Sequence, residues 1–424
     1  MARLLPALFL AFFMHAAAIA QDWQPRDIAD SVAAQIEENY FDEAKATEVA
    51  GVVRQQASGG AYDGITDPFR LASALTETIA PYDGHFRVTW SPPDEAIDGD
   101  DARGRELYSF PDMIRRNGNG FRRVSSLPAN IGYIEMSNFA NIDFGDPNDP
   151  VRQSADAALA LVSEADAVII DLRDNGGGAP SMVGYLTSAF TPPDADIYNV
   201  FIGRGPDQSE APEIFYPHPR LEIPLYVLIS ARTGSAAEAF AYTVKNAGRA
   251  TVIGEASAGA ANPGGLVDAG NGFAVFVSFG APRSPVTGTN WEGDGVAPDV
   301  QVPANEALTT AQRMALDRLA RSSDAAYRQA IAWARESLDQ PVPATGLAAY
   351  SGTFGPYSFE AADNVLHLSQ GRRPVLTLLP LGDDTFFRSD DPLVRYHFIR
   401  SDGSIEAVES MNARGTVTRH DRSE

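Results

Sequence analysis

The chain has 424 residues, of which 44% are hydrophobic, so it can bury more than one core and its length suggests two or three domains. Acidic residues outnumber basic ones by 56 to 33, which gives a net charge of −23 and argues against nucleic acid or anionic membranes as partners. The absence of cysteine excludes disulfides and thiolate metal sites. The six histidines show no paired ligand spacing, so we expect no metal and no cofactor.

Residues 1–20 are typical of a secretory signal peptide. Arg3 precedes the apolar run 4–14, and the small residues of Ala18-Ile-Ala20 follow, so we expect cleavage before Gln21. A membrane anchor is the alternative, but the apolar run is too short to span a bilayer comfortably. The sequence therefore predicts a periplasmic or secreted protein whose mature chain has no membrane span.

The segment that follows predicts a small N-terminal helical domain over residues 21–80. Apolar residues recur there with helical period. Asp67 is a good N-cap residue, and Pro68 suits the first helical position after it. The expected helices cover residues 27–40, 43–56 and 67–80.

Residues 81–338 carry the pattern of an α/β core. The turn pair Asp83-Gly84 precedes a strand in which Phe86, Val88 and Trp90 alternate, which places His85 at a loop–strand junction. From residue 131 onward, short apolar runs alternate with amphipathic segments, as in right-handed βαβ units around a buried parallel sheet. The expected strands are 131–136, 167–172, 225–229 and 250–253, with a further strand at 272–279, and the expected helices are 151–165, 181–189, 236–246 and 306–337.

The last segment, residues 345–424, changes to short strands separated by turns. Prolines at 341 and 343 mark a linker before it, and Ser401-Asp-Gly403 is one of its turn signals. This composition predicts a small antiparallel barrel or sandwich.

Ser235 stands between an expected strand and an expected helix, where functional residues gather in open α/β folds. It also opens the pattern Ser235-Ala-Ala-Glu238, a capping box in which both side chains satisfy amides of the first helical turn. A structural cap is therefore one interpretation, and a nucleophile near the positive end of the helix dipole is the other. The G-x-S-x-G elbow of α/β hydrolases is absent, because residue 237 is alanine.

Three consecutive glycines, Gly176, Gly177 and Gly178, follow an expected strand and precede a helix. They match neither G-x-G-x-x-G nor a Walker motif, so they do not predict a nucleotide site. Such a loop either forms a simple turn or exposes backbone amides as an oxyanion hole.

A serine nucleophile needs a base within hydrogen-bonding reach. Lys245 lies ten residues beyond Ser235, about 15 Å along a helix, which is too far. His85 is the best-placed histidine, although an isolated histidine is usually structural. The acid that orients it could be Glu292 or Asp83, and Glu292 is otherwise an ordinary surface acid.

Three blocks in this order resemble the S41 family of serine peptidases, which includes tail-specific and tricorn-like enzymes. The blocks are IIDLRDNGGG at 169–178, TGSAAE at 233–238 with GRATVIGE at 248–255, and NWEGDGVAPD at 290–299. The family's Ser/Lys branch carries its lysine where this chain has Ala260, so the resemblance is to the His-type branch that is similar to the interphotoreceptor retinoid-binding protein. Residues 90 to 131 leave no room for a PDZ domain.

The resemblance implies a crotonase/ClpP-like α/β core with a peptide or unfolded protein as substrate and a possible homo-oligomer. It implies Ser235 as nucleophile, His85 as base, Glu292 as the acid that orients the base, and the amides of Ala236, Gly177 and Gly178 as the oxyanion hole. We therefore expect a serine-type peptidase that acts on exported proteins or peptides. The alternatives are a non-catalytic ligand-binding relative of the same fold and a hydrolase of non-peptide esters or amides.

Overall fold

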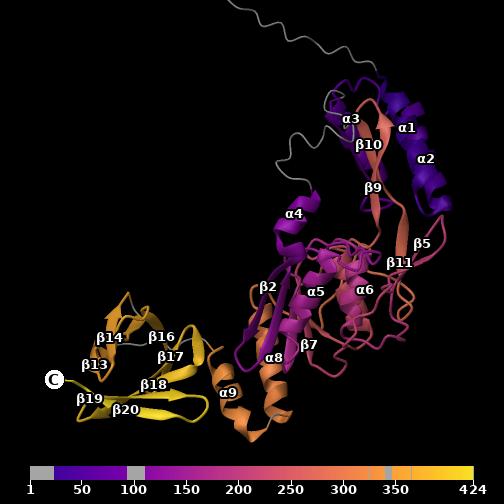
Figure 1. The fold of residues 1–424 in the computed structure, drawn as a ribbon. Coiled ribbons are helices and arrows are strands. Elements are labelled where there is room, and N and C mark those ends of the chain that lie inside the picture. Colours follow the sequence, from indigo (N-terminus) through magenta and orange to yellow (C-terminus); the bar gives the residue numbers. More distant parts are fainter. Residues whose placement is uncertain (1–22, 93–109, 323, 340–345, 364, 424) are drawn as a thin grey trace, which may run out of the picture. The chain divides into compact units, whose positions relative to one another are not determined.

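A computed structural model describes residues 23–92, 110–322, 324–339, 346–363 and 365–423. The predicted signal peptide lies outside these residues. The described residues form two compact units, one within Met1–Gly104 and Gly264–Phe279 and the other within Arg105–Pro263 and Gly280–Glu424 (Figure 1). The predicted domain boundaries stay predictions, although the first unit continues past residue 80 and takes in a segment from the middle of the chain.

In the first unit, three helices share one core with an antiparallel sheet. Helices α1 (Pro25–Asn39), α2 (Glu43–Ser58) and α3 (Pro68–Ile79) form where the sequence predicts them. Asp67 caps α3 by accepting the N–H groups of residues 69 and 70, as predicted. The strands follow the order β1-β10-β9, and their bounds are Arg87–Trp90, Phe273–Ser278 and Gly264–Gly270. Side chains of β1 and β10 that face the helices, such as Val88 and Val275, are buried with them in one core.

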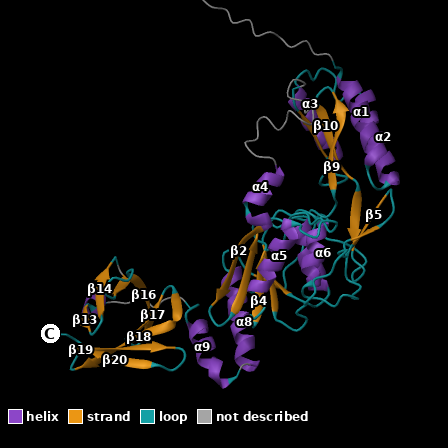
Figure 2. Cartoon of the chain, viewed as in Figure 1, coloured by secondary structure: helices purple, strands orange, loops and turns teal. Residues whose placement is uncertain are grey.

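The second unit is built on a six-stranded sheet in the order β12-β8-β7-β4-β3-β2. Strands β2 and β4 of this sheet are labelled in Figure 2. Strands β3, β4, β7, β8 and β12 run parallel, and β2 is antiparallel to β3. Their bounds are Phe121–Leu127 (β2), Ile131–Met136 (β3), Ala167–Asp171 (β4), Leu225–Ile229 (β7), Thr251–Gly254 (β8) and Val300–Gln301 (β12). The loops that follow the parallel strands therefore gather at one edge of the sheet.

Helices cover both faces of this sheet, which explains the continuous apolar runs of its strands. Ile170 on β4 faces a core shared with α5, α6 and α7, whereas Ile169 on the same strand faces a core shared with α8 and α9. The helix bounds are Pro150–Leu161 (α5), Pro180–Ser188 (α6), Ala236–Asn246 (α7), Ala307–Ser322 (α8) and Ala325–Glu336 (α9). The predicted α/β class is confirmed.

The remaining elements of the second unit before α8 are short. Helix α4 (Phe110–Arg116) precedes β2 and is not among the helices expected from the sequence. Strands β5 (Val200–Gly203), β6 (Gln208–Ser209) and β11 (Gly280–Arg283) form a small antiparallel sheet in the order β11-β5-β6. No helix in the described ranges is long and apolar enough to cross a membrane.

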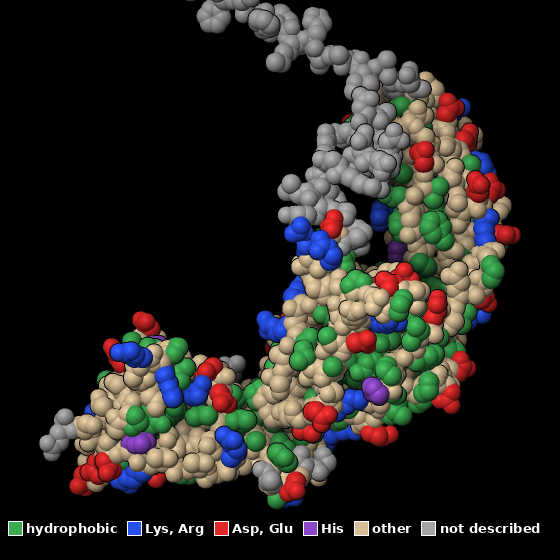
Figure 3. Space-filling model, in the orientation of Figure 1, with side chains coloured by type: hydrophobic (Ala, Val, Ile, Leu, Met, Phe, Trp, Pro, Cys, Tyr) green, Lys and Arg blue, Asp and Glu red, His purple; other side chains and the backbone are tan. Residues whose placement is uncertain are grey.

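The C-terminal segment is an eight-stranded antiparallel sheet that curls toward closure, as the sequence predicts. Its strands follow chain order, and the N–H of Ser423 donates to the Thr353 carbonyl, which joins the last strand to the first. Aromatic residues fill its core, and acidic and basic side chains lie side by side on the face drawn in Figure 3. The strands are Gly352–Phe354 (β13), Tyr357–Ala362 (β14), Val365–Ser369 (β15), Leu376–Gly382 (β16), Thr385–Arg388 (β17), Asp391–Ser401 (β18), Ser404–Asn412 (β19) and Val417–Asp421 (β20).

Candidate active site

Ser235 lies in the turn that joins strand β7 to helix α7. The Thr233 hydroxyl donates to the Leu172 carbonyl at 2.8 Å, and the Gly234 N–H donates to the Asn175 carbonyl at 3.0 Å. These bonds fasten the turn to the loop that follows strand β4. Two neighbouring loops at the carboxyl edge of the sheet are therefore held together, as the sequence pattern predicts.

The backbone of Ser235 adopts φ 50° and ψ −120°, a conformation that side chains with a Cβ rarely enter. Such a conformation costs about 1–3 kcal/mol and persists only where the surroundings impose it. The Ser235 N–H donates to Glu238 Oε2 at 2.8 Å, as a capping box predicts, while the serine itself is exposed. An exposed serine hydroxyl on a strained turn at a helix start is well placed to attack a substrate.

The glycine loop 176–178 approaches this serine closely. A Cβ on Gly177, which has φ +117°, would lie 2.6 Å from the Cβ of Ser235. A Cβ on Gly178, which has φ +143°, would lie 2.0 Å from the carbonyl oxygen of Phe139. Only glycine fits at these two positions, so the loop is more than a simple turn.

Two backbone amides beside Ser235 have no acceptor among the described residues. The Gly177 N–H donates to Asn175 Oδ1 at 2.9 Å, which occupies one of the three predicted oxyanion donors. The amides of Gly178 and Ala236 donate to no acceptor in the part of the chain that the structure describes. Ala236 is the first residue of α7, where the helix dipole favours negative charge. These two amides can therefore bind an oxyanion.

Glu238 is a fully buried carboxylate in the first turn of α7. Besides the Ser235 N–H, it accepts the N–H of Ala260 at 2.9 Å, the N–H of Gly259 at 2.6 Å and the Ser257 hydroxyl at 2.6 Å. The capping pattern predicts only the bond to Ser235. The other three fasten the loop that follows β8 to the start of α7.

Glu292 is held by the same loop. Its Oε2 accepts the N–H groups of Ala261 and Asn262 at 2.8 and 3.0 Å, and the Gly293 N–H donates to the Gly259 carbonyl at 2.9 Å. Residues 259–262 thus touch both Glu238 and Glu292. Within the second unit, the loop after β8 connects the nucleophile candidate to the predicted acid.

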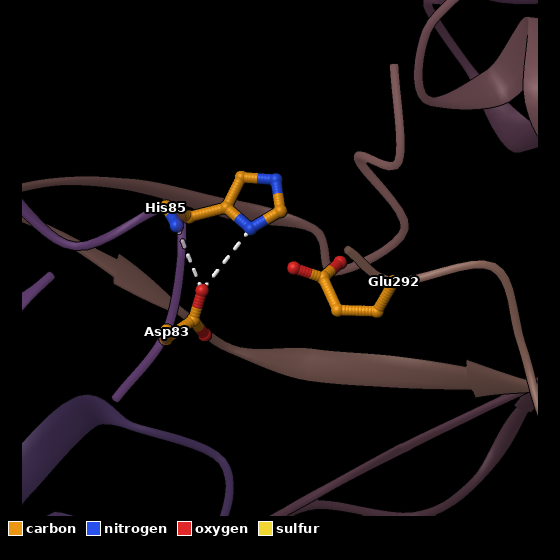
Figure 4. Close-up of side chains that lie close together, drawn as sticks. All are labelled: Asp83, His85 and Glu292. Carbon is orange, nitrogen blue, oxygen red and sulfur yellow. Dashed lines mark hydrogen bonds and ion pairs between the residues drawn. The ribbon is translucent and has the colours of Figure 1, made fainter. Parts of the chain in front are cut away.

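His85 belongs to the first unit, where it pairs with Asp83 (Figure 4). Asp83 Oδ1 accepts the His85 N–H at 2.8 Å and lies 3.2 Å from Nδ1, while Oδ2 accepts the hydroxyls of Tyr40 and Ser278 at 3.0 Å each. Burial would raise the pKa of the Asp83 carboxyl, but the bonds from His85, Tyr40 and Ser278 outweigh it and hold that pKa at about 2. Because an ionised carboxylate only accepts, Nδ1 carries the proton and Nε2 of a neutral His85 is left as the basic nitrogen.

Within the second unit, no lysine provides a base next to Ser235. The sequence contains two lysines, Lys45 and Lys245. Lys45 lies on α2 in the first unit. Lys245 forms an ion pair with Asp299 at 3.1 Å near the far end of α7. The lysine of the second unit therefore does not form a Ser/Lys pair with Ser235.

In the second unit, the structure brings Ser235, Ala236, Gly177 and Gly178 together and connects Glu292 to them through one loop. It places Asp83, which the sequence left as an alternative orienting acid, against the ring of His85. The roles of Asn175 and Ser257 were missed, because the sequence does not show which backbone amide or carboxylate each of these side chains meets.

Residues 130–302 match the model of peptidase family S41, from the strand β3 region through β12. The predicted resemblance to the S41 family is thereby confirmed for this segment of the chain. A candidate peptidase from Parabacteroides merdae is similar to the structure with 19% identity over 68% of this chain and 93% of the other, at a TM-score of 0.48. The photosystem II D1 C-terminal processing protease is similar with 16% identity over 66% and 94% of the two chains, at a TM-score of 0.42. The tricorn protease gives 13% identity over 74% of this chain and 37% of its own, also at 0.42.

Proposed function

We propose that this protein is a serine-type peptidase with Ser235 as nucleophile, His85 as general base and Glu292 as an acid that stabilises the histidine. The S41 region supports a peptidase. The observation that carries the proposal is the backbone of Ser235, held at φ 50° beside the unused amides of Gly178 and Ala236. A merely capping serine has no need of that strain.

In the proposed reaction, Ser235 Oγ attacks the carbonyl carbon of a peptide bond while His85 Nε2 takes its proton. The oxyanion that forms accepts hydrogen bonds from the Gly178 and Ala236 amides. The C–N bond then breaks as His85 passes the proton to the leaving amine. Water, activated by the same histidine, hydrolyses the acyl-enzyme and restores the Ser235 hydroxyl.

Two carboxylates serve this proposal. Asp83 fixes the tautomer of His85 through Nδ1, because its low pKa keeps it ionised at neutral pH. Glu292 supplies negative charge from a side chain that two backbone amides hold in place. Negative charge favours the imidazolium that forms when His85 takes the proton.

We also propose that the substrates are exported proteins or peptides, because residues 1–20 predict a signal peptide. N-terminal sequencing of the protein from the periplasm or the medium should then begin at Gln21. A mature protein that keeps residues 1–20 would contradict export by cleavage.

The central test is labelling of the purified protein with a fluorophosphonate probe, followed by cleavage of casein and of peptide libraries. We expect labelling of the wild-type protein and none of Ser235→Ala, with His85→Ala slowed by at least about 10²-fold. Ser209→Ala, an exposed serine on β6, is the matched control and should label normally.

Two outcomes would replace the proposal with one of its alternatives. Labelling without cleavage of any peptide would indicate a hydrolase of non-peptide esters or amides. Failure of the intact, folded protein to label would leave a ligand-binding protein as the better reading of the fold.

A further inference from the structure

The Glu238 carboxylate is the point where the candidate nucleophile and the loop after β8 are joined. Its side chain is fully buried, and each oxygen accepts two hydrogen bonds. Oε2 takes the N–H groups of Ser235 and Ala260, and Oε1 takes the Gly259 N–H and the Ser257 hydroxyl. All the acceptor sites of an ionised carboxylate are used in this way.

This arrangement requires a carboxylate and not merely a polar side chain. A glutamine at 238 would replace one oxygen by an NH2 group, which would face the N–H of Ser235 and Ala260 or that of Gly259. A donor opposite a donor leaves buried polar groups unpaired. The charge also lies in the first turn of α7, where the helix dipole favours it.

The bond to Ser235 acts on the residue whose backbone is strained. A hydrogen bond to an ionised acceptor is stronger than a neutral one, so it can offset the cost of φ 50° at residue 235. The same carboxylate holds Gly259 and Ala260, directly before the two residues whose amides bind Glu292.

We propose that Glu238 is a positioning residue that sets the conformation of Ser235 and its register with the Glu292 loop. This inference rests on the proposed function of Ser235 as nucleophile. Glu238 itself does not touch substrate; it acts through the Ser235 N–H and through residues 259–260.

The test measures the maximal rate of fluorophosphonate labelling and the half-saturating probe concentration separately. In Glu238→Gln, we expect the maximal rate to fall by about 10²-fold, because small misplacements of a nucleophile have losses of that size. The half-saturating concentration should stay nearly unchanged, since no probe contact is removed. Ser257→Ala is the matched control: it removes one bond to the same buried carboxylate and the bond from the Val296 N–H, but none to Ser235, so its loss should stay below about tenfold.

Glu238→Asp distinguishes loss of Ser235 positioning from general loss of folding. It also replaces Glu238→Gln in the test if the glutamine variant does not fold. It keeps the charge on a shorter side chain, so it should label faster than Glu238→Gln per folded molecule, with folding measured by circular dichroism. Equal labelling rates in folded Glu238→Gln, Glu238→Asp and Ser257→Ala would overturn the inference. Absence of labelling in the wild-type protein would instead reject the proposed function, so the two failures are distinguishable.

Discussion

The Cβ of Ser235 lies only 2.6 Å from the place where a Cβ on residue 177 would stand. Two loops that follow neighbouring parallel strands therefore touch where the candidate nucleophile is held. The contact is possible because residue 177 is glycine, and it brings the glycine loop against the start of α7. Several predictions for the site depend on this contact and on the carboxylates around it.

Gly177→Ala should remove activity without removing any functional side chain. The new methyl group would force the two loops apart, so we expect labelling of Ser235 to fall by at least about 10²-fold. The free energy of unfolding should fall by about 1–3 kcal/mol, because alanine would also be strained at φ +117°. In the control Gly176→Ala, the added Cβ meets nothing within 4 Å, so labelling should stay close to that of the wild type. Equal losses in both variants would show that the close approach is unimportant.

Asp83→Asn should impair the base and leave the nucleophile in place. Asparagine can present its NH2 group to Nδ1 and so favour the wrong tautomer of His85. We expect kcat for peptide cleavage to fall by at least about 10²-fold with little change in KM. Steady-state kinetics over a range of pH measure this, and an unchanged kcat would reject Asp83 as the residue that orients His85.

Asp83 should also contribute to acid stability. Its folded pKa of about 2 lies below the ordinary 3.8, so the ionised carboxylate adds stability above pH 4 that is lost as the pH falls from 4 through 2. The contribution is about 2 kcal/mol. Urea unfolding of the wild type should weaken more steeply over this range than that of Asp83→Asn. The exposed Asp194→Asn serves as control and should follow the wild type.

Glu292→Gln should slow catalysis while the loop around it stays folded. Glutamine keeps an oxygen that can accept the amides of Ala261 and Asn262, but it removes the negative charge. We expect kcat to fall by about 10²-fold and the melting temperature to change little. Kinetics and thermal unfolding of the same preparation check both parts, and full activity would remove Glu292 from the proposed site.

Glu210 supplies a prediction at the other end of the pH range. Burial raises the pKa of this carboxyl to about 8, against a lowering effect of hydrogen bonds from Asn199. Glu210 Oε1 and Asn199 Oδ1 both lack a partner among the described residues. The pKa of Glu210 is higher in the folded than in the unfolded protein. Its contribution to the free energy of unfolding is therefore complete below the ordinary pKa of 4.5 and is lost as the pH rises toward 8.

Glu210→Gln should therefore stabilise the protein at pH 8, by about 1–3 kcal/mol, and have little effect at pH 5. Its NH2 group can donate where the ionised acid cannot. Urea unfolding at the two pH values measures the difference, with the exposed Glu213→Gln as control. A variant that is less stable than the wild type at pH 8 would show that Glu210 is ionised and paired in the fold.

Local patterns predicted most of what surrounds Ser235. The buried strand 225–229, the helix 236–246 and the glycine loop follow from hydrophobic period and capping residues that are close in sequence. The bond between Ser235 and Glu238 follows from the same signals, because the two residues are three apart. The order of the three motif blocks predicted the resemblance to family S41, and the match over residues 130–302 confirms that resemblance.

Long-range contacts could not be predicted in this way. Asp83 receives bonds from Tyr40 and from Ser278, which lie 43 and 195 residues away in the chain. The strand 272–279 was expected, but its pairing with β1 was not, since period-2 alternation identifies a strand and says nothing of its partner. The hydrogen bond from the Gly177 N–H to Asn175 Oδ1 could not be predicted either, because it depends on the rotamer of Asn175.

The discontinuous first unit has a consequence for how the chain acquires its structure. The core beneath α1–α3 includes Phe273, Val275 and Val277, which come from the hairpin β9–β10. A ribosome has made these residues only after most of the central sheet, so the N-terminal helices cannot complete their core early. Contacts of such sequence separation slow folding. An N-terminal fragment that ends at residue 104 should be aggregation-prone. His85 stacks on Phe276, so its side chain should reach its final position only after the same hairpin has formed.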